Sequence, residues 1–138
     1  MTKDVLISIK GNHDYGDSEE PIEIMTRGEC VGDDGAFYIS YDEMLDDGGI
    51  IKNRIVISDG EILMEKHGFA EVVMKFREGE SSVSEYATEY GDFVIGFDTR
   101  RVKKSVTQEL IETEIEYEIA INGEPASRCC LNISIRPA

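Results

Sequence analysis

Several features that mark common protein classes are rare in this sequence of 138 residues. It contains no tryptophan, only three prolines and only three cysteines, Cys30, Cys129 and Cys130. An odd number of cysteines provides no disulfide framework and is typical of a reducing compartment. Cys129 and Cys130 are adjacent, so on a strand they point to opposite faces, which disfavours a disulfide or a shared metal ion. The cysteines therefore indicate neither redox nor zinc chemistry.

Long apolar runs and basic residues are also scarce. No apolar run approaches the roughly 20 residues of a membrane span. The first residues, Met1 to Asp4, lead into alternating sequence without the apolar region of a secretory signal, so we expect a cytoplasmic protein. The 14 basic residues against 29 acidic ones leave a net charge of -15. Such a surface repels nucleic acid and anionic membranes, and we expect neither as a partner. Most of the charge is expected to be the solvated face of strands, and a basic partner or a cation is the alternative.

Motifs for catalysis or metal binding are weak. The two histidines, His13 and His67, have no partner that the sequence identifies, and there is no Gly-x-Ser-x-Gly nucleophile motif. Two acidic loops, at residues 13–20 and 42–47, have oxygen ligands suited to calcium or magnesium, but neither has the Asp-x-Asp-x-Asp-Gly spacing of a calcium loop. We expect solvated loops, surface histidines, no catalytic residue, no metal site and no cofactor. Positive evidence for an enzyme is lacking.

What the sequence has in abundance is alternation of apolar and polar residues. From Ile111 to Ile121, the odd-numbered positions hold apolar residues and Thr113, and most of the even-numbered positions hold glutamate. The turn residues Asn122-Gly123 then precede a second alternating run, Cys129 to Ile135. Because side chains alternate between the two faces of a strand, this pattern predicts a long hairpin with one buried face. That face needs the rest of the chain to cover it.

Shorter alternating runs follow one another along the rest of the chain, and no segment has a helical period. Asp59-Gly60 is the strongest hairpin turn among them, whereas residues 11–20 read as a loop. No clear turn residue separates the run 102–108 from Ile111, so a bulge and one long bent strand are both compatible with that junction. The other expected strands are 5–10, 21–31, 36–41, 50–58, 61–67, 70–77, 82–88 and 92–99.

This succession of strands predicts the fold class. Sequential strands joined by tight turns pair with their neighbours, and closing the sheet removes its exposed edges. We therefore predict an all-β protein with a single domain over residues 1–138. It is expected to form an antiparallel up-and-down β-barrel of about 8 to 10 strands rather than a two-sheet sandwich.

Several short motifs, spread from Val5 to Ile135, resemble one known family when their order and spacing are taken together. They are the segment Ile39-Ser40-Tyr41-Asp42-Glu43, the Gly68 turn before Met74-Lys75-Phe76, the segment Tyr86-Ala87-Thr88-Glu89-Tyr90-Gly91 followed by Phe97-Asp98-Thr99, and the Tyr117 strand with its Asn122-Gly123 turn. The third is similar to a Tyr-x-Thr-Pro-aromatic-Gly pattern, with Glu89 in place of proline. The chain resembles the YwiB-like family of small bacterial proteins of unknown function. That resemblance implies a calycin-like (lipocalin-like) β-barrel in a bacterial cytosol, and it implies no activity.

The interior of such a barrel either holds a small ligand or is filled by side chains. Tyr86 and Thr88 share one face of their strand, so both point inward or both outward. Inward hydroxyls among aliphatic walls suit a small amphipathic ligand, and the alternative is an ordinary core. The candidate ligand-binding residues are Tyr41, Tyr86, Thr88, Phe97 and Tyr117. The apolar parity predicts an inner face that includes Phe37, Ile39, Tyr41, Phe93, Ile95, Phe97, Tyr117 and Ile119.

One basic cluster, Arg100, Arg101, Lys103 and Lys104, interrupts the acidic sequence. It could bind an anion at the barrel rim or dock the acidic face of a second copy, and the alternative is a charged edge strand that discourages aggregation. Two functions follow from these readings. The first is binding of a small amphipathic molecule in the barrel interior. The second is a packed barrel that acts on protein partners, including a second copy in a homodimer, through its acidic surface or basic strand.

Overall fold

The structure is a computed structural model that describes residues 2–16, 18–68, 71–88 and 91–138, without the side chains of residues 2 and 86–88. Within these ranges no helix has the length and apolar character of a membrane span. Ten strands are present: β1 (Thr2–Asp14), β2 (Glu19–Asp33), β3 (Ala36–Met44), β4 (Ile50–Ser58), β5 (Glu61–His67), β6 (Glu71–Arg77), β7 (Ser81–Thr88), β8 (Gly91–Val106), β9 (Ile111–Ile121) and β10 (Glu124–Pro137).

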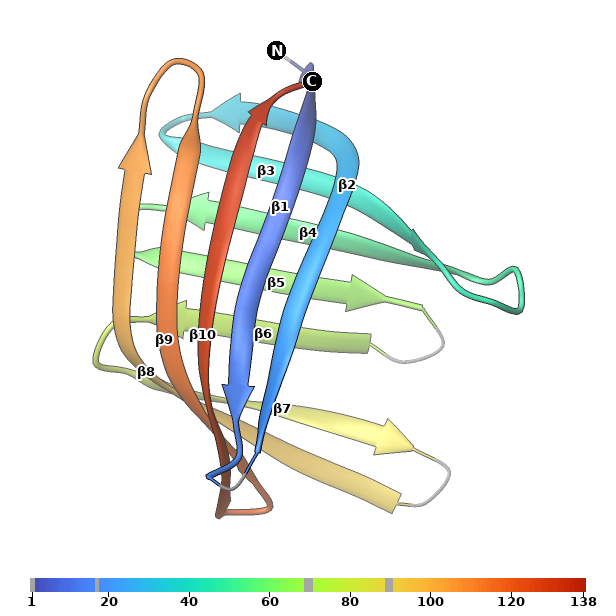
Figure 1. Ribbon diagram of the computed structural model, residues 1–138, viewed down its shortest axis with the longest axis vertical. Helices are drawn as coiled ribbons and strands as arrows, with labels where there is room; N and C mark the ends of the chain where they lie inside the picture. Colours follow the sequence, from blue (N-terminus) through green and yellow to red (C-terminus); the bar gives the residue numbers. More distant parts are fainter. Residues whose placement is uncertain (1, 17, 69–70, 89–90) are drawn as a thin grey trace.

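All ten strands belong to one antiparallel sheet in the order β6-β5-β4-β3-β2-β1-β10-β9-β8-β7. Every neighbour in this order is also a neighbour in sequence, except for β1 and β10, which join the two ends of the chain. The all-β, up-and-down prediction is therefore confirmed. In Figure 1, β1, β8, β9, β10 and the lower part of β2 run along the long axis in front, and β3 to β6 cross behind them. The two layers enclose the core.

The barrel is nearly closed between β6 and β7, the two ends of the sheet. No ladder joins these two strands in the described register, but single hydrogen bonds cross the seam. The Ser82 hydroxyl donates to the Lys75 carbonyl at 2.9 Å. Beside the β6–β7 turn, Thr99 donates its amide to the Glu80 carbonyl at 3.1 Å and accepts from the Gly79 amide at 2.9 Å. These contacts hold the edges together without full strand pairing.

One local expectation was wrong, and the structure settles one junction that the sequence left open. Residues 11–20 are mostly strand, because β1 pairs continuously with β10 and β2 as far as Asp14. Hydrogen bonding on both sides of β1 outweighs the polar composition there. The junction before Ile111 is a turn, in which Thr107 and Leu110 exchange hydrogen bonds, with the Thr107 hydroxyl accepting from the Leu110 amide at 3.1 Å. The irregularity lies earlier, between Thr99 and Arg101, inside the single long strand β8.

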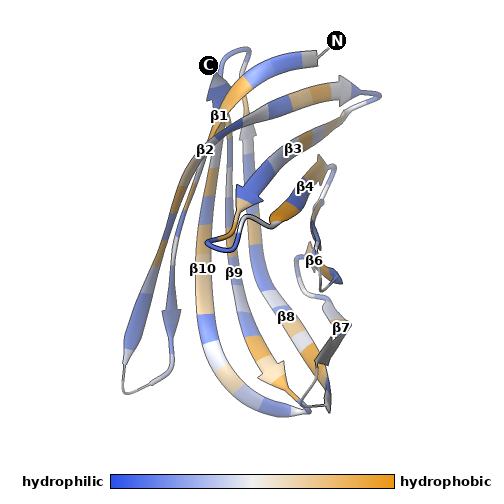
Figure 2. Ribbon diagram, turned by 90° about the vertical axis from the view of Figure 1, so that its right-hand side faces the viewer, coloured by the Kyte–Doolittle hydropathy of each residue, from blue (hydrophilic) through white to orange (hydrophobic). Residues whose placement is uncertain are grey.

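Alternation along the strands builds the inner face, as Figure 2 shows by the changes of colour along β9 and β10. On β9 the inward residues from Ile111 to Tyr117 are buried and the glutamates between them are not, whereas Ile121 at the end of the strand is exposed. Of the residues expected inside, Ile39, Tyr41, Phe97 and Tyr117 are buried, whereas Phe37, Ile95 and Ile119 are partly buried against the core. Phe93 departs from the expectation with 36% exposure, because it lies near the start of β8 and pairs with β7, the last strand of the sheet. The side chains with the least exposure are Phe76, Ile7, Ile39, Ile55, Ile57, Ile62, Ile115, Ile133 and Thr99.

Candidate functional site

A row of polar side chains crosses the inner face of the front layer. In the strand register Thr99, Tyr117, Cys129 and His13 lie directly opposite one another on β8, β9, β10 and β1. Thr99, Tyr117 and Cys129 are buried, with 1%, 5% and 5% exposure. We call these four residues the cysteine row. It is the register, and not proximity in sequence, that brings them together.

Hydrogen bonds within the cysteine row converge on Cys129. Its sulfur lies 2.7 Å from His13 Nδ1 and 3.6 Å from the Ser127 hydroxyl. The Tyr117 hydroxyl also donates a hydrogen bond to it. Burial raises the pKa of the Cys129 thiol, and the hydrogen bonds from Ser127 and Tyr117 act in the opposite direction. With a raised pKa the group at neutral pH is a thiol, which is suited to hydrogen bonding rather than to nucleophilic attack.

Thr99 adds a buried hydroxyl without a partner to the same row. Its Oγ1 has no hydrogen bond to any described group, and the same holds for Thr113 Oγ1. An unsatisfied buried polar group costs about 1 to 3 kcal/mol. The Thr99 hydroxyl, beside Tyr117 on the inner face, therefore has unused hydrogen-bonding capacity.

Tyr117 is also packed into an aromatic cluster with Phe76 and Phe97. The ring centroids lie 4.7 Å apart for Phe76 and Tyr117, 5.8 Å for Phe76 and Phe97, and 6.1 Å for Phe97 and Tyr117. Phe76 comes from the back layer, so the cluster joins the two layers of the barrel. It fills the space beside the cysteine row and leaves the hydroxyl of Tyr117 as its polar end.

A second polar row lies on the inner face of the back layer. Tyr41, Asn53 and Lys66 are directly opposite one another on β3, β4 and β5. Glu43, two residues after Tyr41, accepts hydrogen bonds at Oε1 from Asn53 Nδ2 at 3.2 Å and from Lys66 Nζ at 3.3 Å. Asn53 is 4% exposed, whereas the side chains of Lys66 and Glu43 are 34% and 35% exposed. We call these four residues the lysine row; its ion pair is half-buried and faces inward.

Tyr41 and Tyr117 should titrate later than exposed tyrosines. Burial, followed by the charge of Glu43, raises the pKa of Tyr41 from 10.0 to about 12, and burial raises that of Tyr117 still further. The folded state retains protons that the unfolded chain releases above pH 10, so this stability is present below pH 10 and is lost as the pH rises towards 12. Phenolate absorbance of the native protein should show a late phase, and Tyr41→Phe should shrink it. Complete titration near pH 10 in a still-folded protein would contradict the burial of both hydroxyls.

The residues predicted to bind a ligand fall into three groups. Phe97 and Tyr117 are in contact, and Tyr41 belongs to the lysine row on the opposite layer. The side chains of Tyr86 and Thr88 lie outside the described residues; their backbones pair with Phe93 and Gly91. His13, Cys129 and Lys66 were missed as candidates. The parity of the run Ile9-x-Gly11-x-His13 would have placed His13 on the inner face, but no local signal relates it to Cys129.

The acidic loops and the basic cluster have structural partners within the chain. Among the described residues no group of three or more histidines, cysteines or carboxylates is arranged to hold a metal ion. Arg100 pairs with Glu118 at 3.0 Å and Arg101 with Glu116 at 3.8 Å. Lys104 donates to the Ser58 carbonyl at 3.3 Å. The basic cluster lies on the second half of β8, which pairs in the described ladders with β9 alone, as expected for a charged edge.

Comparison with known proteins identifies relatives over nearly the whole chain. A family model described as "Domain of unknown function (DUF1934)" matches residues 7–133. The "Uncharacterized beta-barrel protein YwiB" of Bacillus subtilis (strain 168) is 23% identical over 120 residues, which cover 87% of this chain and 84% of that protein. The crystal structure of the ywiB protein from Bacillus subtilis matches with a TM-score of 0.86 and 20% identity, over 99% of this chain and 93% of that one. The structural match shows that the two proteins share the barrel fold.

Proposed function

The chain belongs to the DUF1934 family, and we propose that it binds a small amphipathic molecule on the inner face of its barrel, between the cysteine row and the lysine row. The observation that carries this proposal is the inward Lys66–Glu43 ion pair. A core does not need such a pair, because moving charges out of water costs several kcal/mol per ion. On an inner face that is mostly apolar, it is suited to holding the polar end of a guest.

The surroundings of the two rows suit the apolar part of such a molecule. Met64 and Met74 lie directly opposite each other on β5 and β6, on the same face as Lys66 and next to Phe76. Methionine side chains adapt to irregular apolar shapes, and aromatic rings supply flat walls. The half-buried imidazole of His13 is available to orient a polar group of the guest. This combination of apolar walls and a few polar groups is typical of small-molecule sites.

Anilinonaphthalenesulfonate, an apolar ring system with one anionic group, is the probe for this site. We expect saturable binding to the native protein, detected by fluorescence, and at least roughly tenfold weaker binding to Lys66→Met. The substitution removes the cation and leaves Glu43 to repel the sulfonate. Lys75→Met is the matched control, because Lys75 also pairs with a glutamate, Glu61 at 3.2 Å, but is more exposed, with 55% of its side chain accessible. Its affinity should equal that of the unmodified protein.

Two outcomes would overturn the proposal: equal affinity of the Lys66→Met and Lys75→Met variants, or no saturable binding by a protein that unfolds cooperatively. The second outcome would favour the alternative, a packed barrel that acts through its surface. One observation supports that alternative. The hairpin between β3 and β4 extends from the barrel in Figure 1, and its Met44 and Ile50 are 77% and 51% exposed. Such side chains are suited to contact with a protein partner or a second copy.

A further inference from the structure

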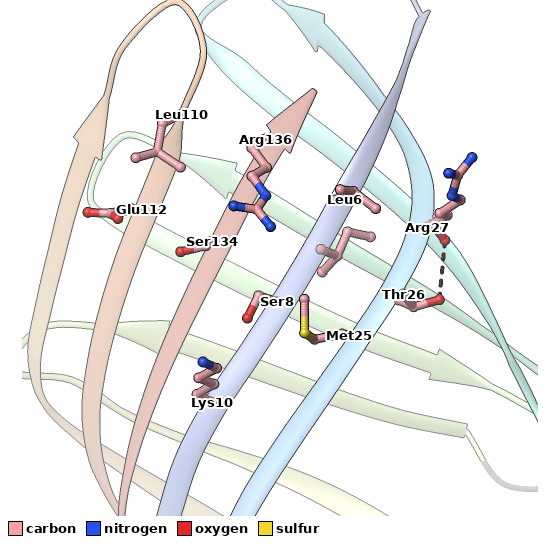
Figure 3. Close-up of a pocket in the computed structure, with 11 residues that line it drawn as sticks. Leu6, Ser8, Lys10, Met25, Thr26, Arg27, Leu110, Glu112, Ser134 and Arg136 are labelled. Carbon is pink, nitrogen blue, oxygen red and sulfur yellow. Dashed lines mark hydrogen bonds between the residues drawn. The ribbon is translucent and has the colours of Figure 1, made fainter. Parts of the chain in front are cut away.

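A groove of about 500 Å³ lies on the outer face of the front layer, on the opposite side of the sheet from the cysteine row. Figure 3 shows its side chains, which come from β1, β2 and β10, from the start of β9 and from the turn before it. At its centre Ser8 and Ser134 lie directly opposite each other, and both are half-buried. Lys10 follows Ser8 by two residues on β1, and Arg136 follows Ser134 by two residues on β10. Because these strands are antiparallel, the two cations flank the serine pair from opposite ends.

The cations of this groove lack the partners that other cations of the same face have. Arg100 and Arg128 both contact Glu118, at 3.0 and 3.2 Å. Lys10, Arg27 and Arg136 form no ion pair with any described carboxylate, although Glu23 lies directly opposite Lys10. In a chain of net charge -15, unpaired cations gathered at one groove create a local positive field within an acidic surface.

We propose that this groove binds an organic oxyanion, a carboxylate or phosphate that carries a short apolar group. The oxyanion lies over Ser8 and Ser134, accepts hydrogen bonds from their hydroxyls, and is held between Lys10 and Arg136. Residues two apart on a strand are separated by about 6.6 Å, so each cation reaches the serine pair through its own flexible side chain. A guanidinium can also donate two parallel hydrogen bonds to a carboxylate or phosphate.

The other side chains of the groove define the rest of the ligand. Leu6, Met25 and Leu110 form an apolar rim, and Met25 is 60% exposed. These side chains cover the apolar group of the ligand, and Arg27 adds positive charge at the edge. Glu112 lies directly opposite Ser134 on β9 and is exposed. Its carboxylate repels an anion at the serine pair and lowers the affinity. Removing the charge of Glu112 should therefore strengthen the binding of an anion.

The test uses n-hexyl phosphate and the full chain at low ionic strength, with backbone amide chemical shifts as the readout. We expect saturable shifts at Ser8 and Ser134, at least tenfold weaker binding for Arg136→Met, and several-fold tighter binding for Glu112→Gln. Arg101→Met is the matched control, since Arg101 lies on the same face but is paired with Glu116. Its affinity should remain that of the unmodified protein. A second arm with vesicles of phosphatidylcholine and phosphatidic acid tells a lipid headgroup from a soluble anion as the source of the phosphate.

The proposal fails if Arg136→Met binds hexyl phosphate as tightly as Arg101→Met, or if Glu112→Gln leaves the affinity unchanged. It is independent of ligand binding on the inner face. Side chains of β1 alternate between the two faces, so those of Ser8 and Lys10 point outward at the groove, whereas the side chains of Ile7 and Ile9 are buried in the core. The Lys66→Met variant should therefore bind hexyl phosphate normally, which separates failure of one site from failure of the other.

Discussion

Replacing Phe76 by alanine should lower the free energy of unfolding by about 3 to 5 kcal/mol. Phe76 is fully buried, and its ring packs against Phe97 and Tyr117 between the two layers of the barrel. Truncation removes this apolar contact and leaves a cavity that the surrounding strands cannot close, because they are fixed by their ladders. The midpoint of chemical denaturation, with fluorescence of the tyrosines as the signal, measures the loss.

Two further variants serve as controls for the Phe76 prediction. Phe93→Ala makes the same chemical change at a side chain with 36% exposure, and should cost much less. Phe76→Leu retains most of the volume and should cost roughly 1.5 kcal/mol, so a stability is measurable even if Phe76→Ala does not fold. Equal losses for Phe76→Ala and Phe93→Ala would show that Phe76 is not the centre of the core.

Replacing Gly11 by alanine should be about as damaging, at roughly 3 kcal/mol or more. A Cβ at Gly11 would collide with the backbone carbonyl oxygen of Cys130 and lie 2.7 Å from Leu131 Cδ2. A backbone atom cannot move aside as the end of a side chain can, and β1 is held by ladders on both sides. The strain should also displace His13, two residues further along β1, from Cys129.

Gly96→Ala is the matched control for Gly11→Ala. Gly96 also lies within a strand, β8, but the nearest atom to an added Cβ is Ala120 Cβ at 3.8 Å, an ordinary contact. Alanine restricts the unfolded chain more than glycine, so this variant should be neutral or more stable by about 0.5 kcal/mol. Thermal unfolding of both variants compares the two positions. Similar midpoints for the two would mean that β1 and β10 are not as closely packed as the structure has them.

The same alternation that builds the core separates two chemistries in the front layer. On the inner side, β8, β9, β10 and β1 present the cysteine row, where Cys129 contacts His13 and the Thr99 hydroxyl is buried without a partner among the described residues. On the outer side, β9, β10, β1 and β2 present the groove, where cations are left unpaired. One layer of strands can therefore carry two independent polar sites, and substitutions at neighbouring positions test them separately.

Local pattern was sufficient for most of the secondary structure, apart from residues 11–20, and for the two faces of most strands. The run from Ile111 to Ile121 predicted β9 and the burial of its inward residues, which holds as far as Tyr117, because side chains alternate by local geometry alone. The turns at Asn122-Gly123 and Asp59-Gly60 were also predictable, because their residues favour tight hairpin turns, whereas the turn before Ile111 was not. Asn122, Gly123 and Gly60 have the positive φ angles, 51°, 85° and 73°, that their turns require. These features made the all-β class readable from the sequence, and the family resemblance supported the barrel.

Tertiary structure alone decided which residues share a site. His13 and Cys129 are 116 positions apart, and they meet because β1 pairs with β10 in one particular register. The lysine row depends in the same way on the registers of β3, β4 and β5. Register and closure arise from contacts across the whole molecule, which a period-two pattern leaves open. The sequence by itself therefore determined the strands and their faces, and only the fold determined the two rows, the exposure of Phe93 and the unpaired cations of the groove.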